Sequence, residues 1–254
     1  MTTFAISPRR TAGLAKANAR LLIRNRLTLV YGIVLPLLPL ALLLGGRGDD
    51  AGGAVAVSSV LMLALLFPVY YNVLSAVVTR RDELVLKRLR SGETRDLELL
   101  VGIALPGAVV AVAVAALTVL LGVAFGLSAP LNPLVYAVGV LAGCVLFAAF
   151  AVWTAAWTRT AEAAQMTSMP VILLAAIGMM GTVLPEGLAD IVTWTPGGAL
   201  DQLVRVGWFG MGPNGDLDLT QTWFAAVRPL GVLLAWTVLA LWLAKRSMRW
   251  EPRT

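Results

Sequence analysis

The chain has 254 residues, of which 59% are hydrophobic and 13% are charged, and its mean hydropathy is +0.83. Soluble domains carry about a quarter charged residues, so this composition excludes a water-soluble globule and predicts an integral membrane protein. The absence of histidine excludes Ser-His-Asp catalysis and His-ligated metals, and the single cysteine, Cys144, excludes an internal disulfide.

Basic and apolar side chains alternate at helical spacing near the N-terminus. Residues 8–26, "PRRTAGLAKANARLLIRNR", are predicted to form an amphipathic helix on the membrane surface. In this helix Leu14, Leu21 and Leu22 would dip into the lipid, while the basic side chains would stay at the head groups. A disordered basic arm is the alternative interpretation.

Six apolar runs follow, and a helix needs about 20 apolar residues to cross the hydrocarbon core of a bilayer. The first run is too long for the core of a cleaved signal sequence, so we expect it to be retained. In the third run, Pro106 is expected to cause a tilt or a break. The sequence therefore predicts an all-α membrane protein with one transmembrane domain over residues 1–254. The six predicted transmembrane helices cover residues 27–45, 54–79, 99–127, 131–157, 167–184 and 222–244.

Lysines and arginines are distributed unevenly about these six runs. All but three of the 20 lie before the first run, in the loops after the second and fourth runs, or in the C-terminal tail. The three on the other side are Arg47, Arg205 and Arg228. The positive-inside rule then predicts a multi-pass protein with both termini in the cytoplasm. A basic inner surface that meets anionic lipids also accounts for the net charge of +6, without a nucleic-acid partner.

Residues 80–100, "RRDELVLKRLRSGETRDLELL", are the most highly charged stretch of the chain and lie between the second and third runs. Leu86 and Leu89 fall on one helical face and charged side chains on the other, which predicts a short amphipathic helix over residues 80–92. For the residues alone, a solvated loop that only anchors the topology is the simpler interpretation.

This stretch resembles the segment that follows the second transmembrane helix in type-2 permeases of bacterial ATP-binding-cassette exporters of drugs, antibiotics or lipids. In those permeases an acidic residue precedes a Lys-Arg-Leu-Arg pattern, and Asp82 and residues 86–90 match it. Leu84 and Glu93 depart from the glycine and proline that are common there. The resemblance implies a short helix that docks in a groove of a separate ATPase. The coupling residues that it implies are Arg81, Asp82, Glu83, Leu86, Lys87, Arg88, Leu89 and Arg90.

Residues 185–221 lie between the fifth and sixth runs. Pro185 and Pro196 interrupt the chain, and Asp201 and Arg205 have the i,i+4 spacing of an ion pair. The resemblance implies a hydrophobic re-entrant hairpin in this region, on the outer side of the membrane. The alternative is an ordinary outer loop with tryptophan side chains at the membrane interface.

The chain lacks the phosphate-binding motif G-x-x-x-x-G-K-[ST], and the dipeptide Gly-Lys does not occur. We therefore predict no catalytic, cofactor-binding or metal-ligating residue in this chain. ATP and Mg²⁺ would be bound by the partner ATPase subunit, which is expected in two copies. A second copy of the chain, or a related permease, would complete the transport pathway.

The predicted function is that of the permease subunit of an ATP-driven exporter in the bacterial plasma membrane, for a hydrophobic or amphiphilic substrate such as a drug, a lipid or a lipopeptide. The alternatives are an ion-coupled secondary transporter and an intramembrane lipid-modifying enzyme. Both place ionisable residues inside the membrane, and the six runs hold almost none. Four residues are candidates for a substrate path, although bonding between helices and gap filling are their simpler roles. They are Asn72, Ser75, Met169 and Met179.

Overall fold

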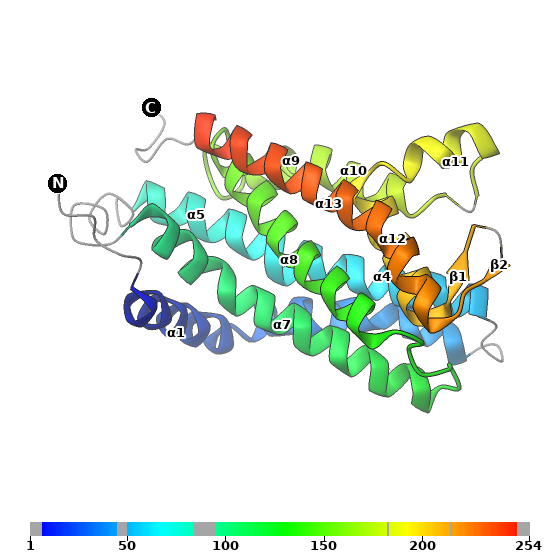
Figure 1. The fold of residues 1–254 in the computed structure, drawn as a ribbon. Helices are drawn as coiled ribbons and strands as arrows, with labels where there is room; N and C mark the ends of the chain where they lie inside the picture. The colour runs from blue at the N-terminus through cyan, green and yellow to red at the C-terminus, as the bar shows by residue number, and fades with distance from the viewer. Residues whose placement is uncertain (1–6, 45–49, 84–94, 182, 214, 248–254) are drawn as a thin grey trace.

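The computed structural model describes residues 7–44, 50–83, 95–181, 183–213 and 215–247. Helices make up most of this part of the chain, and the long ones run side by side along the molecule (Figure 1). Among the described residues, four helices are long and apolar enough to cross a membrane. They are Asp50–Asp82, Asp96–Ala124 (α7), Pro133–Ala155 (α8) and Leu219–Ser247 (α13). They correspond to the second, third, fourth and sixth predicted runs, and the all-α membrane class is confirmed.

The first and fifth predicted transmembrane helices are more broken than expected. The first run forms α2 (Arg26–Leu29), the π-helical η1 (Val30–Val34), α3 (Leu35–Leu37) and the 3-10 helix η2 (Leu38–Leu44). Pro36 and Pro39 lie in this run, and each lacks the N–H that a continuous α-helix needs. In the fifth run, predicted over residues 167–184, the helix is α10 (Met169–Gly178), and the short α9 (Ala164–Thr167) ends at the first residue of the run. The count of six spans therefore stays a prediction.

The second span is one continuous element in three parts. α4 (Asp50–Ala64) passes through a π-helical turn, η3 (Leu65–Tyr71), into α5 (Asn72–Asp82). Pro68 lies inside the π-helical turn, whose wider winding accommodates a residue without an N–H. A Cβ on Gly107 of α7 would lie 1.9 Å from the Pro68 carbonyl oxygen. Only glycine at position 107 therefore lets the two backbones touch.

α7 continues through Pro106, so of the tilt or break expected near this proline the break is absent. Pro106 has no N–H to donate to the Gly102 carbonyl four residues earlier. The side-chain amide of Asn18, from α1 (Pro8–Arg24), donates to that carbonyl instead, with an Nδ2–O distance of 2.7 Å. A hydrogen bond from another helix thus takes the place of the one that proline removes.

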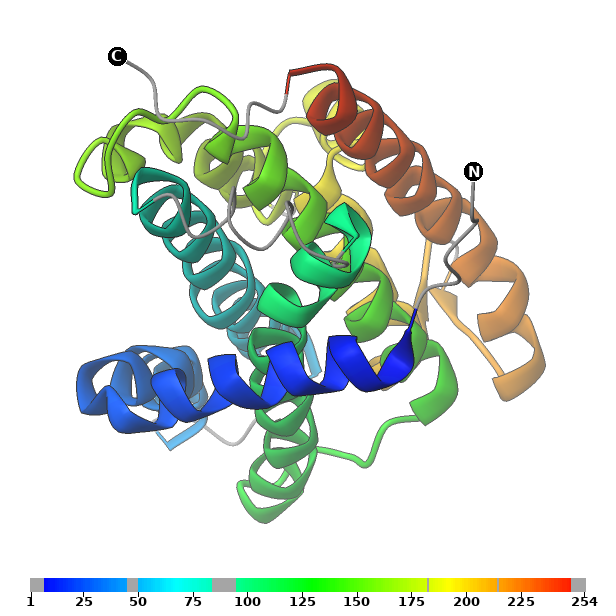
Figure 2. The ribbon, with the colours of Figure 1, turned by 90° about the vertical axis from the view of Figure 1, so that its left-hand side faces the viewer.

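α1 lies across one end of the long helices and packs against α7 (Figures 1 and 2). Ala15 and Leu22 are buried against the protein, and Leu14 packs beside Gly102. Of the three leucines predicted to enter the lipid, only Leu21 is exposed, at 61%. A helix is present where it was predicted, but much of its apolar face contacts the protein because it covers the start of α7.

Two short helices and a small hairpin form the region between α10 and α13. α11 (Glu186–Val192) and α12 (Pro196–Phe209) are followed by the paired strands β1 (Met211–Gly212) and β2 (Gly215–Asp216). α12 packs among α4, α8, α10 and α13. Its start touches the end of α10 closely, since a Cβ on Gly178 would lie 2.2 Å from the Gly198 nitrogen. The predicted ion pair is present, with Asp201 Oδ2 and Arg205 Nε 2.7 Å apart.

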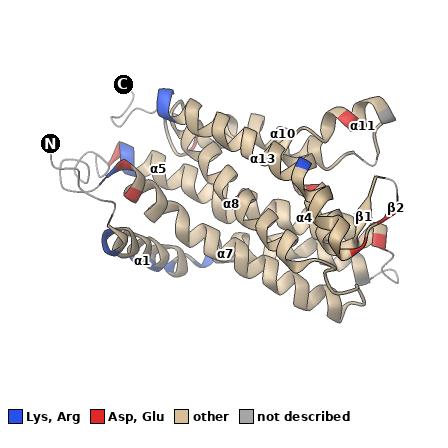
Figure 3. Ribbon diagram, in the orientation of Figure 1, with Lys and Arg blue, Asp and Glu red and all other residues tan. Residues whose placement is uncertain are grey.

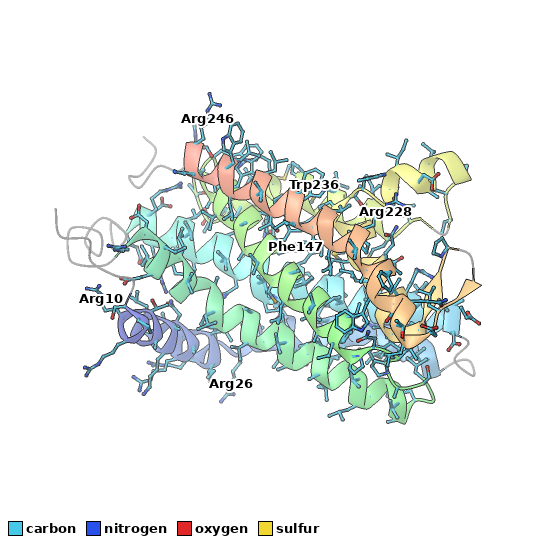
Figure 4. The ribbon with its side chains drawn as sticks, in the orientation of Figure 1. Arg10, Arg26, Phe147, Arg228, Trp236 and Arg246 are labelled. Carbon is cyan, nitrogen blue, oxygen red and sulfur yellow. The ribbon has the colours of Figure 1, made fainter. Side chains whose placement is uncertain are left out.

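Arg228 of α13 holds the corner between α11 and α12. Its guanidinium carbon lies 4.8 Å from the centre of the Trp194 ring, and its Nη2 donates to the Thr193 hydroxyl at 3.1 Å. Trp236, two turns further along α13, donates from Nε1 to the Trp194 carbonyl at 2.8 Å (Figure 4). The corner is therefore joined to α13 by a cation–π contact and two hydrogen bonds.

Charged side chains collect at the two ends of the molecule (Figure 3). One end, which we call the basic end, holds α1, the end of α5, the start of α7 and the end of α13. It carries most of the Lys and Arg residues that the structure describes. The opposite end holds α11, the β1–β2 hairpin and the start of α4. The described members of the basic set that the sequence assigns to one side of the membrane thus lie at one end of the molecule.

Candidate functional site: a polar pocket at the basic end

One face of α5 carries a row of polar side chains toward the basic end. Asn72, Ser75, Thr79 and Glu83 follow one another at intervals of three or four residues, which places them on one helical face. Among the described residues, no hydrogen bond joins the side chains of the first three to another group. Lipid cannot satisfy polar groups inside a membrane, so unpaired ones mark a cavity or a transport path. Bonding between helices, the simpler role expected for Asn72 and Ser75, is not seen.

This polar row forms one wall of a pocket of about 440 Å³ between α1, α5 and α7. Arg80 and Asn18 add further polar groups, and Ile103 of α7 with two leucines of α1 adds apolar surface. Within the described part of the chain, the charged residues that line this space are one cation, Arg80, and one carboxylate, Glu83. A pocket with convergent polar groups and an apolar wall can orient an amphiphilic molecule.

Asn18 ties the three helices around the pocket together. Its Oδ1 accepts a hydrogen bond from Arg80 Nη2, and its Nδ2 donates to the Gly102 carbonyl of α7. The same side chain therefore orients the cation of the pocket and completes the helical turn that Pro106 interrupts. Because both of its polar atoms are used, Asn18 holds α1 at a defined distance from α5 and α7.

The residue after Arg80 has a different environment. Arg81 is 1% exposed; its Nη1 donates to the Ala155 carbonyl at 2.8 Å, and its Nη2 to the carbonyls of Thr158 and Arg159 at 2.5 and 3.2 Å. These carbonyls lie at and after the C-terminus of α8, where helical partners are missing and the helix dipole attracts a cation. Asp82 Oδ1 lies 3.6 Å from Arg81 Nε. Arg81 thus fastens the end of α5 to the end of α8.

A second buried charge, Glu98, lies in the first turn of α7. Its Oε1 accepts a hydrogen bond from the Ser7 N–H at 2.6 Å, and its Oε2 accepts one from the Arg95 N–H at 3.1 Å. Arg10 Nη2 lies 3.5 Å from Oε1. These donors and the positive end of the helix dipole stabilise the ionised carboxylate. Glu98 therefore fastens the start of α1 to the start of α7.

The structure brings some of the predicted substrate-path residues together and separates others. Asn72 and Ser75 both line the pocket. Met169 is the first residue of α10 and is exposed, and Met179 directly follows this helix and packs against the core. Neither methionine lines the pocket, so the four candidates do not form one site.

The predicted coupling residues fall into two groups. Of the range 80–92 expected to form a separate helix, residues 80–82 form the last turn of α5, which continues to Asp82 without a break. Arg81 is buried and directed at α8, whereas Asp82 and Glu83 are exposed. The other coupling residues lie outside the residues that the structure describes. They are Leu86, Lys87, Arg88, Leu89 and Arg90.

Sequence reasoning missed Asn18, Thr79 and Arg80 as pocket residues. The spacing from Asn72 to Thr79 could have indicated a polar face on α5. Asn18, however, is 62 residues from Arg80 and 84 from the carbonyl that it binds, and no local pattern links such distant positions.

The described residues contain no group of His, Cys, Asp or Glu that could hold a metal ion. The long apolar helices define an α-helical membrane protein of the multi-pass class. A family model described as "ABC-2 family transporter protein" matches residues 44–245, and the chain belongs to this family. No curated protein matches its sequence. The chain is thus a transmembrane subunit of an ATP-binding-cassette transporter, is not itself the ATPase, and works with an ATPase subunit.

Proposed function

We propose that this chain is the permease of an exporter in the bacterial plasma membrane that moves a hydrophobic or amphiphilic substrate, such as a drug, a lipid or a lipopeptide, out of the cell. The pocket at the basic end carries this proposal, because it combines unpaired polar side chains with an apolar wall at the end of membrane-crossing helices. Two ATPase subunits bind ATP and Mg²⁺. A second copy of the chain, or a related permease, completes the pathway.

In this proposal the basic end faces the cytoplasm and six spans place both termini there. α1 lies on the inner membrane surface, and the region from α11 to β2 enters the membrane from outside. The excess of Lys and Arg at the basic end supports this orientation. Accessibility tags at Gly46 and Gly215 are expected to be outside, and tags at Gly92 and the C-terminus inside. A cytoplasmic signal at Gly215 would refute the six-span arrangement.

Residues 84–94 connect α5 to α7, and their proposed role is to dock on the ATPase. The two buried charges flank this segment: Arg81 lies just before it and Glu98 just after it. A displacement of the segment therefore reaches α8 through Arg81 and α1 through Glu98. The hydrogen bonds of Arg81 and Glu98 support a role for the segment in transmitting movement of the ATPase to the membrane helices.

The Leu89→Asp variant tests the docking role. The proposed contact buries the apolar face of the segment, so aspartate there places an unpaired carboxylate in the interface. We expect the ATPase to be lost from pull-downs, or ATP hydrolysis to continue without substrate efflux. Leu86→Met keeps volume and polarity and is the matched control, with nearly unchanged efflux. Normal pull-down and efflux for Leu89→Asp, at equal membrane expression, would reduce residues 84–94 to a topological anchor.

A secondary transporter or an intramembrane enzyme is less well supported. Both need buried ionisable groups that are free to bind ions or to exchange protons. Among the described residues the buried ionisable groups of charged type are Arg81 and Glu98. Both are occupied by backbone groups of neighbouring helices, which gives them a structural role.

A further inference from the structure

We infer that the pocket between α1, α5 and α7 binds the head group of a zwitterionic amphiphile, a molecule with an anionic phosphate, a cationic ammonium group and acyl chains in the inner leaflet. The inference rests on the proposed function for the orientation of the basic end toward the cytoplasm. It goes beyond that function by naming the chemistry that the pocket recognises.

The charges of the pocket carry the first step. Among the residues that the structure describes, its lining has one cation, Arg80, and one carboxylate, Glu83, so this described lining has no net charge. An anionic head group is ordinarily bound by a cluster of Lys and Arg. A guanidinium binds phosphate through charge-assisted hydrogen bonds, and a carboxylate binds an ammonium group. A lining with one guanidinium and one carboxylate therefore complements a head group with one phosphate and one ammonium group.

The second argument is the order of Arg80 and Glu83 along the chain, which matches the order of phosphate and ammonium in a lipid head group. Glu83 lies three residues beyond Arg80, about 4.5 Å further along the helix axis and nearer the end of α5. In the proposed orientation the carboxylate is therefore closer to the cytoplasm than the guanidinium is. A zwitterionic lipid has the same order, because its ammonium group lies further from the acyl chains than its phosphate does. Asn72, Ser75 and Thr79 lie on the membrane side of Arg80 and offer hydrogen bonds to the ester region.

The apolar side of the pocket carries the third step. Leu22 and Ile103 line it from α1 and α7, and Leu21 lines it while remaining 61% exposed. Along the following segment of the chain, Leu27 and Tyr31 are also exposed. Apolar surface that begins inside the pocket and is open at Leu21 suits acyl chains that leave the pocket for the bilayer.

Native mass spectrometry of the purified, delipidated full chain tests the inference without an ATPase or nucleotide. The probes are phosphatidylethanolamine and phosphatidylglycerol of equal chain length, offered at equal concentration. We expect the wild type to retain the ethanolamine lipid preferentially. Glu83→Gln leaves a net positive pocket and is expected to shift the ratio about tenfold toward phosphatidylglycerol. Arg80→Gln is expected to weaken retention of both lipids about tenfold, since both carry the phosphate.

Arg24→Gln is the matched control, because Arg24 is an exposed cation of α1 that does not line the pocket. Its lipid ratio is expected to equal that of the wild type. Unchanged ratios for Glu83→Gln and Arg80→Gln would overturn the inference, as would an equal effect of Arg24→Gln. If Arg80→Gln does not fold, Ser75→Leu is the second test, because leucine fills the pocket without changing its charge. Undiminished retention of phosphatidylethanolamine by Ser75→Leu would overturn the inference.

The bound lipid is either a resident lipid of the protein or the exported cargo. Reconstituted vesicles of the permease–ATPase complex with labelled phosphatidylethanolamine separate them. ATP-dependent movement of the label across the bilayer identifies cargo, and label that stays bound through turnover identifies a resident lipid. Either result supports the site. Because lipid binding is measured on the chain alone, absent binding would overturn the lipid site and leave the exporter proposal standing.

Discussion

Replacing Arg81 with methionine removes the charged contact between α5 and α8 while keeping a long side chain. The change leaves the carbonyls of Ala155 and Thr158, which now accept hydrogen bonds of 2.8 and 2.5 Å, without their donor. The site is closed, since Arg81 is 1% exposed, so water cannot readily replace the guanidinium. The expected result is a large loss of stability and a looser end of α5.

The magnitude follows from the hydrogen bonds that are lost. A hydrogen bond to a charged group contributes about 1.5–3 kcal/mol, so two of them amount to about 3–6 kcal/mol. Removing a buried charge relieves part of its desolvation, which leaves a net destabilisation of about 2–4 kcal/mol. At about 2–4 °C per kcal/mol for a chain of this size, the unfolding midpoint is expected to fall by about 4–16 °C.

Cys144 provides the assay without engineering. It is the only cysteine of the chain and is buried, so a thiol-reactive fluorophore reports unfolding in detergent. Arg159→Met is the control, because this neighbouring side chain is exposed and only its carbonyl contacts Arg81. Its free energy of unfolding is expected to stay within about 0.5 kcal/mol of the wild-type value. An Arg81→Met midpoint equal to that of the wild type would refute the structural role given to Arg81.

Three further predictions concern packing, docking and energy. Gly178→Ala is expected to separate α10 from α12 and to lower the free energy of unfolding by about 1–3 kcal/mol, because its Cβ would lie 2.2 Å from the Gly198 nitrogen. Gly187→Ala is the control, because no atom of the described residues lies near its Cβ, and it is expected to leave the thiol assay unchanged. Glu98→Gln is expected to release the start of α1 from the Ser7 contact, seen as faster trypsin cleavage at the arginines of α1, and unchanged cleavage would contradict the proposed fastening. The purified chain is expected to hydrolyse no ATP, and contaminant-free hydrolysis would exclude the permease role.

Periodicity and charge predicted much of the architecture. The four long helices of the structure match four of the six predicted runs because a continuous apolar stretch of about 20 residues has few alternatives to a membrane helix. The helix predicted over residues 8–26 is present as Pro8–Arg24. Asn72 and Ser75 could be singled out as candidates because polar side chains stand out in an apolar run, and the structure places both in the pocket.

The parts that sequence could not predict depend on contacts between distant residues. Pro106 normally interrupts a helix, and its effect was misjudged because the repairing donor, Asn18, belongs to another helix. The resemblance implies that Arg81 is a coupling residue and does not indicate its buried position, because the carbonyls that it binds lie 74 and 77 residues further along the chain. Local patterns contain no information on such partners.

The continuous element from Asp50 to Asp82 has the shape of a lever. Its 33 residues rise about 50 Å, more than the thickness of a bilayer with its head groups. Pro68 lies where Gly107 touches it, about 21 Å from the basic end and about 27 Å from the other. A tilt of about 5° about this contact moves the two ends by about 2 Å in opposite directions. If the element is rigid, a small displacement at the pocket end produces an opposite displacement about 1.3 times as large at the other end.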